Sequence, residues 1–159
     1  MSHMIGHHAQ AIVMAGWAPT HGASPSVRTL AARIINAQQD EIATMRQWLR
    51  DRRQPVPGQG AGGTAMRMDG AAHEMLMPGM LTEAQLRQLD AARGPGFDRL
   101  FLTFMIQHHR GAVTMVRDLF GSYGAGRDRT VFKFASDVSV DQSTEVARME
   151  QMLAALPPE

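Results

Sequence analysis

The residues best suited to chemistry occur in a phrase that the chain contains twice. The first copy is MIGHHAQAIVMA, from Met4 to Ala15, and the second is MIQHHRGAVTMV, from Met105 to Val116. Each copy places two adjacent histidines six residues before a methionine. Imidazole and thioether together suit copper in both of its oxidation states. The phrase therefore predicts a metal site.

On a helix, successive side chains advance by about 100°, so each copy gathers its His and Met residues on one arc with a small alanine between them. The arc also carries an aspartate, Asp98, two turns before the second copy, and the first copy has no counterpart of it. The candidate ligands are Met4, His7, His8 and Met14 in the first copy, and Asp98, Met105, His108, His109 and Met115 in the second.

A second duplicated pattern follows each His-His copy. Gln38, Glu41, Ile42, Met45 and Leu49 recur 104 residues later as Gln142, Glu145, Val146, Met149 and Leu153, whereas the His-His copies are 101 residues apart. A turn of slightly different length absorbs the difference. The repeated unit is thus a helical hairpin, and a pseudo-twofold axis would set the two His-His helices in equivalent positions.

Four residues of this second pattern join the candidate metal site: Glu41, Met45, Glu145 and Met149. The carboxylates could ligate a metal or orient a ligating imidazole. They could also be boundary carboxylates paired with arginine. The methionines could equally be core residues, because Met fills irregular gaps in protein interiors.

The sequence predicts an all-α fold and a single domain over residues 1–159. Apolar periodicity and capping residues predict helices over 1–17, 25–53, 97–120 and 128–156, with a short extra helix over 82–92. Gly94-Pro95-Gly96 is expected to end the short helix before the third long helix. The first hairpin is residues 1–53, a Met- and Gly-rich linker with the short helix is 54–95, and the second hairpin is 96–156. Two such hairpins predict a four-helix bundle.

Composition excludes several classes of function. The net charge is +1, from 16 basic and 15 acidic residues, which gives no basis for nucleic-acid binding. No apolar run reaches the length of a membrane span. There is no cysteine, so disulfides and thiolate sites are excluded. No signal peptide is visible, but the chain starts inside an expected helix, which suggests that an upstream segment was removed.

The linker is itself rich in methionine. Residues 66–80, MRMDGAAHEMLMPGM, hold five of the chain's 13 Met and one His. This segment could capture or hand over a soft ion, or it could be a lid that packs against the end of the bundle.

These stretches resemble the domain-of-unknown-function 305 family. The resemblance rests on MIGHHAQAIVMA, INAQQDEIATMRQWL, DQSTEVARMEQML and the long stretch MPGMLTEAQLRQLDAARGPGFDRLFLTFMIQHHRGAVTMV, which together cover most of the chain. It implies a ferritin-like four-helix bundle, exported to the periplasm or cell surface, with some members implicated in copper binding. The motif points to His7, His8, Met14, Asp98, His108, His109 and Met115. The family's Asp-Phe turn before the first Met-Ile is absent here.

The leading hypothesis is a metal-binding protein, for Cu(I) or Cu(II), that sequesters the ion, confers tolerance to it or delivers it, with a metal-transfer partner or a homo-oligomer as further partners. One alternative is a metal-free helical interaction module whose histidines are satisfied by carboxylates. Another is a ferritin-like metalloenzyme, which ranks lower because no Glu-x-x-His occurs in the chain. Zinc or iron fits the methionine content less well than copper.

Overall fold

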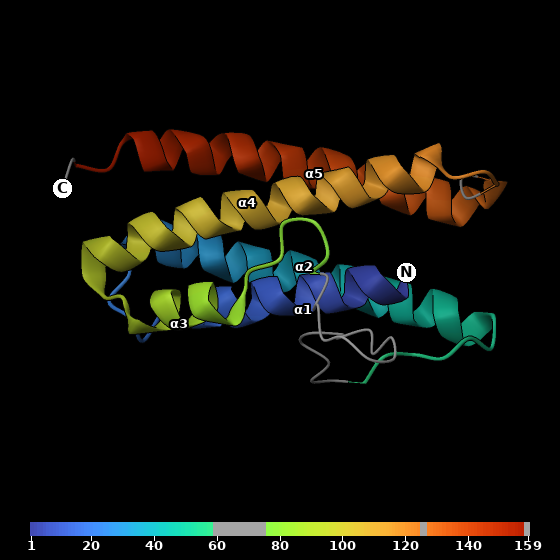
Figure 1. Cartoon of the computed structure of the whole chain (residues 1–159), viewed down its shortest axis with the longest axis horizontal. Helices are drawn as coiled ribbons and strands as arrows, with labels where there is room; N and C mark the ends of the chain where they lie inside the picture. Colours follow the sequence, from blue (N-terminus) through green and yellow to red (C-terminus); the bar gives the residue numbers. More distant parts are fainter. Residues whose placement is uncertain (59–75, 125–126, 158–159) are drawn as a thin grey trace, which may run out of the picture. The chain divides into compact units, whose positions relative to one another are not determined.

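The computed structural model describes residues 1–58, 76–124 and 127–157 (Figure 1). Within these ranges all regular secondary structure is helical, and no strand occurs. The helices are α1 (Ser2–Gly16), α2 (Pro25–Asp51), α3 (Glu83–Ala91), α4 (Gly94–Gly121) and α5 (Arg129–Ala154). The predicted all-α class, with two long helical hairpins and one short extra helix, is therefore confirmed.

Local sequence explains where several helices begin. The Ser24 side chain accepts a hydrogen bond from the Val27 N–H, and Pro25 occupies the first turn of α2. Both choices are favourable, because the first N–H groups of a helix have no partner within it. At α3, Thr82 and Gln85 form a reciprocal capping box, as their spacing predicts.

The start of α4 differs from the prediction. The helix begins at Gly94 rather than at residue 97, so Pro95 lies inside it. Proline is tolerated there because a first-turn N–H needs no partner in the helix. Gly94 has a φ of +57°, and its N–H donates to the carbonyl of His21 at 2.8 Å. This tertiary hydrogen bond thus fixes the conformation of a residue that was expected to separate two helices.

The described chain forms two compact units, and the boundary falls within α4, between Phe101 and Leu102. The first unit contains α1, α2, α3 and the start of α4. The second contains residues 78–80, the rest of α4 and α5.

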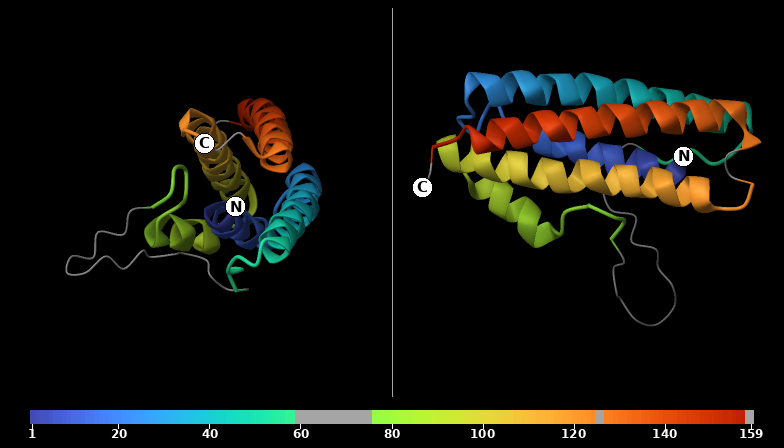
Figure 2. Two further views of the ribbon diagram at one scale, coloured as in Figure 1. Left: turned by 90° about the vertical axis from the view of Figure 1, so that its right-hand side faces the viewer. Right: turned by 90° about the horizontal axis from the view of Figure 1, so that it is seen from above.

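In the first unit, α1 and α2 lie side by side as a hairpin (Figures 1 and 2). The apolar stripe of α2 repeats at helical spacing, and all its members are buried. They are Val27, Leu30, Ile34, Ile42, Met45 and Leu49. In the second unit, α4 and α5 form the corresponding hairpin, joined by polar contacts and by the ring contact of Phe120 with Phe132.

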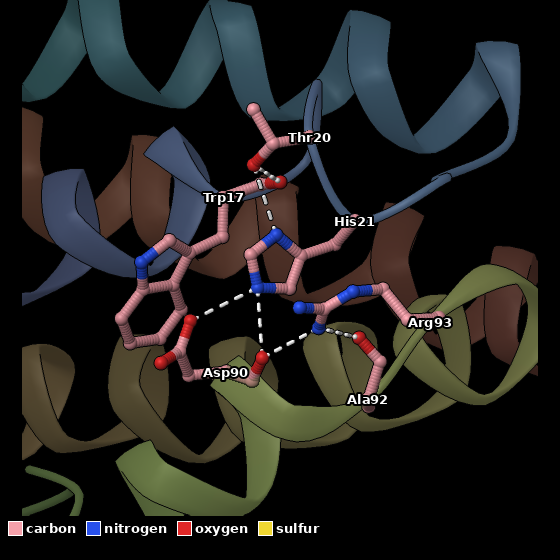
Figure 3. Close-up of polar contacts among 6 residues, drawn as sticks. All are labelled: Trp17, Thr20, His21, Asp90, Ala92 and Arg93. Carbon is pink, nitrogen blue, oxygen red and sulfur yellow. Dashed lines mark hydrogen bonds and ion pairs between the residues drawn. The ribbon is translucent and has the colours of Figure 1, made fainter.

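His21 fastens the turn between α1 and α2 to the end of α3 (Figure 3). Its Nε2 lies 2.9 Å from the Asp90 carbonyl oxygen and 3.0 Å from the Asp90 carboxylate, and its Nδ1 lies 2.9 Å from the Thr20 hydroxyl. The rings of Trp17 and Phe97 contact its imidazole. This histidine is buried and fully engaged in holding the turn.

The segment before α3 is held at equivalent positions of the two His-His helices. In the first unit, the Gln10 side chain donates to the Leu81 carbonyl at 3.0 Å and accepts from the Leu81 N–H at 2.8 Å. In the second unit, Gly79 lies directly on Gly111, where an added Cβ would overlap the Pro78 carbonyl. Gln10 and Gly111 are 101 residues apart, so they occupy the same place in the repeat.

The Met-rich stretch 66–80 is only partly described, since residues 66–75 lie outside the described ranges. Its last methionine, Met80, is buried, and Met77 is half-buried. Whether this stretch captures a soft ion or acts as a lid therefore stays a prediction.

Candidate metal site

The histidine pair of α1 is completely buried, and the second histidine pairs with a carboxylate of α2. His7 and His8 are each 0% exposed. The Nε2 of His8 lies 2.5 Å from Glu41 Oε2. Because a carboxylate only accepts, Nε2 donates this hydrogen bond, and in the neutral form of the ring the lone pair then lies on Nδ1. The Nδ1 of His8 is buried and has no hydrogen-bond partner among the described residues.

The second hairpin repeats this arrangement. His108 and His109 of α4 are also 0% exposed. The Nε2 of His109 lies 2.6 Å from Glu145 Oε2 on α5. The Nδ1 of His109 is buried, again without a hydrogen-bond partner in the described part of the chain.

The orientation of the rings repeats as well. The centroids of His7 and His8 are 6.4 Å apart with their planes at 59°, and those of His108 and His109 are 6.1 Å apart at 57°. Two adjacent residues on a helix cannot point in one direction, so each pair spreads its rings over two directions. The duplication seen in the sequence thus extends to side-chain geometry.

The candidate carboxylates differ slightly in access to solvent. The side chain of Glu41 is 16% exposed and that of Glu145 is 25% exposed. Each reaches a fully buried imidazole from the rim of its hairpin. The partner is a histidine of the preceding helix in both cases, not the arginine that was the alternative.

The methionines of the candidate site fall into two groups. Four are 0% exposed: Met14, Met45, Met105 and Met149. Met4 and Met115 are half-buried. All six lie on the helices that carry the histidines and glutamates.

Asp98 has a partner elsewhere in the fold. It is 3% exposed, and its two carboxylate oxygens lie 3.1 and 3.2 Å from the Ser24 nitrogen, which donates to them. Ser24 is the N-cap of α2, so this carboxylate holds the turn between α1 and α2 and the start of α2.

Two further buried polar residues were not among the candidate ligands. Gln38 and Gln142 are 1% and 2% exposed, and each amide Oε1 lacks a hydrogen-bond partner in the described ranges. The 104-residue repeat contains both, and that repetition was the available signal.

No three His, Asp or Glu side chains of the described residues gather closely enough to hold a metal ion. Each hairpin instead brings together an imidazole and a carboxylate, with thioether and amide side chains on the same two helices. A metal bound in one hairpin would therefore need thioether sulfur or amide oxygen as a ligand in addition to imidazole nitrogen.

The family model described as "Domain of unknown function (DUF305)" matches residues 1–153. The chain belongs to the DUF305 family. This confirms the family predicted from the duplicated phrases. The chain has no significant match among curated protein sequences.

Solved structures are similar over nearly the whole chain. A DUF305 fragment from Deinococcus radiodurans is 30% identical, with a TM-score of 0.79 over 98% of this chain and 93% of that one. A DUF305 protein from Streptomyces coelicolor, described as a candidate secreted protein, is 27% identical, with a TM-score of 0.76 over 95% of this chain and 86% of that one. These similarities agree with the predicted fold class.

A third similar structure is CopM in its Cu(II)-bound form, which is 30% identical, with a TM-score of 0.71 over 96% of this chain and 92% of that one. CopM is also known in Cu(I)-bound and silver-bound forms. Separately, none of the helices in the described ranges has the length and apolar character needed to cross a membrane.

Proposed function

We propose that this DUF305 protein binds copper through its duplicated His-His hairpins and serves to sequester or deliver the ion. One observation carries the proposal. In each hairpin, a buried histidine bonds a carboxylate through Nε2 and keeps a buried Nδ1 without a hydrogen-bond partner among the described residues.

This arrangement is what a metal-binding imidazole requires. A ligating histidine usually donates its other ring N–H to a carboxylate, which fixes the tautomer and makes the ligand more basic. The hydrogen bonds of His8 with Glu41 and of His109 with Glu145 support this role for the two glutamates. In this proposal the two glutamates orient the imidazoles, and the metal bonds to Nδ1.

The rest of the donor set favours copper over harder or borderline metals. Structural zinc takes four cysteine, histidine or carboxylate ligands, and the chain has no cysteine. The described residues also do not gather three His, Asp or Glu side chains. Thioethers at hand in each hairpin, such as Met14 and Met105, are soft donors suited to Cu(I).

Each hairpin has one further proposed imidazole ligand, His7 in the first and His108 in the second, since they are fully buried beside His8 and His109, respectively. Met4, Met45, Met115 and Met149 are proposed as thioether ligands or as neighbours that keep water from the ion. The similarity to CopM, which is known in copper- and silver-bound forms, supports the choice of metal.

Location and partners are part of the same proposal. The similar Streptomyces coelicolor protein is described as a candidate secreted protein. We therefore propose a periplasmic or cell-surface protein that passes the ion to a partner protein or holds it in a homo-oligomer.

A metal-free interaction module is the second candidate, because the Nε2 of both His8 and His109 already has a protein partner. Elemental analysis of the full chain, purified without a histidine tag and equilibrated with copper, zinc, iron and manganese, separates the candidates. One or more copper ions per chain are expected. Iron or manganese would indicate the ferritin-like enzyme instead, and no bound metal would leave the interaction module.

A further inference from the structure

Two buried glutamines stand out because their polar ends are not satisfied within the described chain. Gln38 of α2 is 1% exposed and Gln142 of α5 is 2% exposed, yet neither Oε1 has a hydrogen-bond partner among the described residues. Leaving a buried acceptor unsatisfied costs free energy, so such groups are uncommon without a reason. Here the same exception occurs twice, at equivalent positions of the repeat.

Helical spacing places each glutamine on the face that meets the histidine helix. Gln38 precedes Glu41 by three residues, about one turn, and Glu41 bonds His8. Met45 follows Gln38 by seven residues, about two turns, and so lies on the same line of the helix. The buried amide, the buried thioether and the carboxylate that holds the imidazole therefore share one side of α2.

The second hairpin has the same order on α5. Gln142 precedes Glu145 by three residues, and Glu145 bonds His109. Met149 lies about two turns after Gln142 and is 0% exposed. The pattern of an unsatisfied amide one turn before the carboxylate is thus not an accident of a single helix.

We propose that Gln38 and Gln142 each give their amide oxygen to the bound ion and so tune each hairpin for Cu(II). This inference rests on the proposed copper binding and extends it to the choice of oxidation state. An amide oxygen is a harder donor than a thioether, so it favours Cu(II), whereas methionine favours Cu(I). The amide is also neutral, and a buried neutral group costs far less desolvation free energy than a buried carboxylate.

The test replaces both amides by an apolar side chain of similar size, as Gln38→Leu with Gln142→Leu. The matched control is Gln39→Leu with Gln151→Leu, since these glutamines lie on the same two helices and are exposed. Dissociation constants for Cu(II) and Cu(I) are measured by chelator competition, and the metal-free proteins are compared in thermal melts.

We expect the buried pair of substitutions to weaken Cu(II) binding by at least about tenfold, the lower limit for residues that only support a metal site, because here a donor atom is lost. Cu(I) binding should stay as in the parent. The melting temperature of the metal-free protein should be unchanged or higher, because an unsatisfied buried acceptor has been removed. The control should match the parent in all three measurements.

A second variant keeps the test decisive if leucine impairs folding. Gln38→Met with Gln142→Met keeps the length of the side chain and exchanges an oxygen donor for a thioether. It should weaken Cu(II) binding and leave Cu(I) binding equal or tighter.

Two results would overturn the assignment of the glutamines. One is Cu(II) binding equal to the parent in both variants while His8→Ala with His109→Ala loses copper, which would leave the copper proposal standing. The other is a lower melting temperature of the metal-free protein with Cu(I) and Cu(II) weakened alike, which would show a purely structural role. A parent protein that binds neither ion would overturn the proposed function itself.

Discussion

Replacing Glu145 by glutamine should weaken copper binding without unfolding the protein. The substitution keeps an oxygen that can accept from His109 Nε2, at the position now 2.6 Å away, but removes its negative charge. A hydrogen bond to a charged group contributes about 1.5–3 kcal/mol, against about 0.5–1.5 kcal/mol for a neutral one. The difference is about 1–1.5 kcal/mol. It corresponds to about a tenfold loss of copper affinity if the charge stabilises mainly the metal-bound state.

The same substitution in the first hairpin should cost more. Glu41 is 16% exposed and Glu145 is 25% exposed, so solvent screens the charge of Glu41 less. We therefore expect Glu41→Gln to weaken binding by more than Glu145→Gln, within the range of about tenfold to hundredfold that supporting residues of metal sites show.

The assay is competition with a Cu(I) chelator, with His7→Ala and His8→Ala together as the background for Glu145→Gln, so that the first hairpin offers no imidazole. Glu150→Gln is the matched control, because Glu150 lies on the same helix and forms an exposed ion pair with Arg110. Exposed ion pairs of this kind contribute little to the stability of the folded protein. If Glu145→Gln loses no more affinity than Glu150→Gln, the carboxylates do not support a metal-binding imidazole.

Three further predictions test individual residues and conditions. Met115→Leu nearly conserves side-chain volume, so it should lower the free energy of unfolding by under about 1.5 kcal/mol while weakening Cu(I) binding more than Cu(II) binding. His109→Ala should weaken the binding of both ions. If Met115→Leu binds Cu(I) as the parent does in a chelator titration, Met115 is a core residue. Copper affinity should be lower at pH about 5 than at pH about 7.5, because protons compete with the metal for imidazole nitrogens, and equal Cu(I) affinity at the two pH values would indicate a site dominated by thioethers. Gly111→Ala should lower the stability by about 1–3 kcal/mol in urea melts, because its Cβ would overlap the Pro78 carbonyl; an unchanged midpoint would show that residues 78–80 move aside freely.

The hairpins could be predicted from sequence because their signals are local. The apolar stripe of α2, the Ser24-Pro25 start and the Thr82 capping box each act within a few residues, and all are present in the structure. The predicted start of α4 was wrong because Gly94-Pro95-Gly96 has the glycine and proline composition that usually interrupts a helix. Where the helix begins depends on a hydrogen bond from the Gly94 N–H to the carbonyl of His21, a residue far away in the sequence.

The partners of the site residues could not be predicted, because they depend on how two helices align. His8 meets Glu41 across 33 residues, and His109 meets Glu145 across 36. A helical projection places each residue on an arc but does not say what faces that arc. For the same reason the projection put Asp98 on the ligand arc but could not predict that its carboxylate accepts from the Ser24 N–H, 74 residues away. That Asp98 ligates a metal stays a prediction.

Gln38 and Gln142 show a different limit. The repeat contained both, and Gln38 lies four residues from Ile34 and from Ile42 of the apolar stripe, but glutamine is a common helix residue and neither position pointed to a ligand. Only burial together with the unsatisfied Oε1 singles them out.

The most direct test of the central claim is the state of the ring nitrogens of His8 and His109 in long-range ¹H–¹⁵N correlation spectra, recorded before and after adding Ag(I) as a diamagnetic substitute for Cu(I). We expect both metal-free rings to be protonated at Nε2, where each lies next to a glutamate, and Ag(I) to shift both Nδ1 resonances while Nε2 keeps its proton. Bound silver with both Nδ1 resonances unchanged, or coordinated through Nε2 with the glutamates displaced, would contradict it.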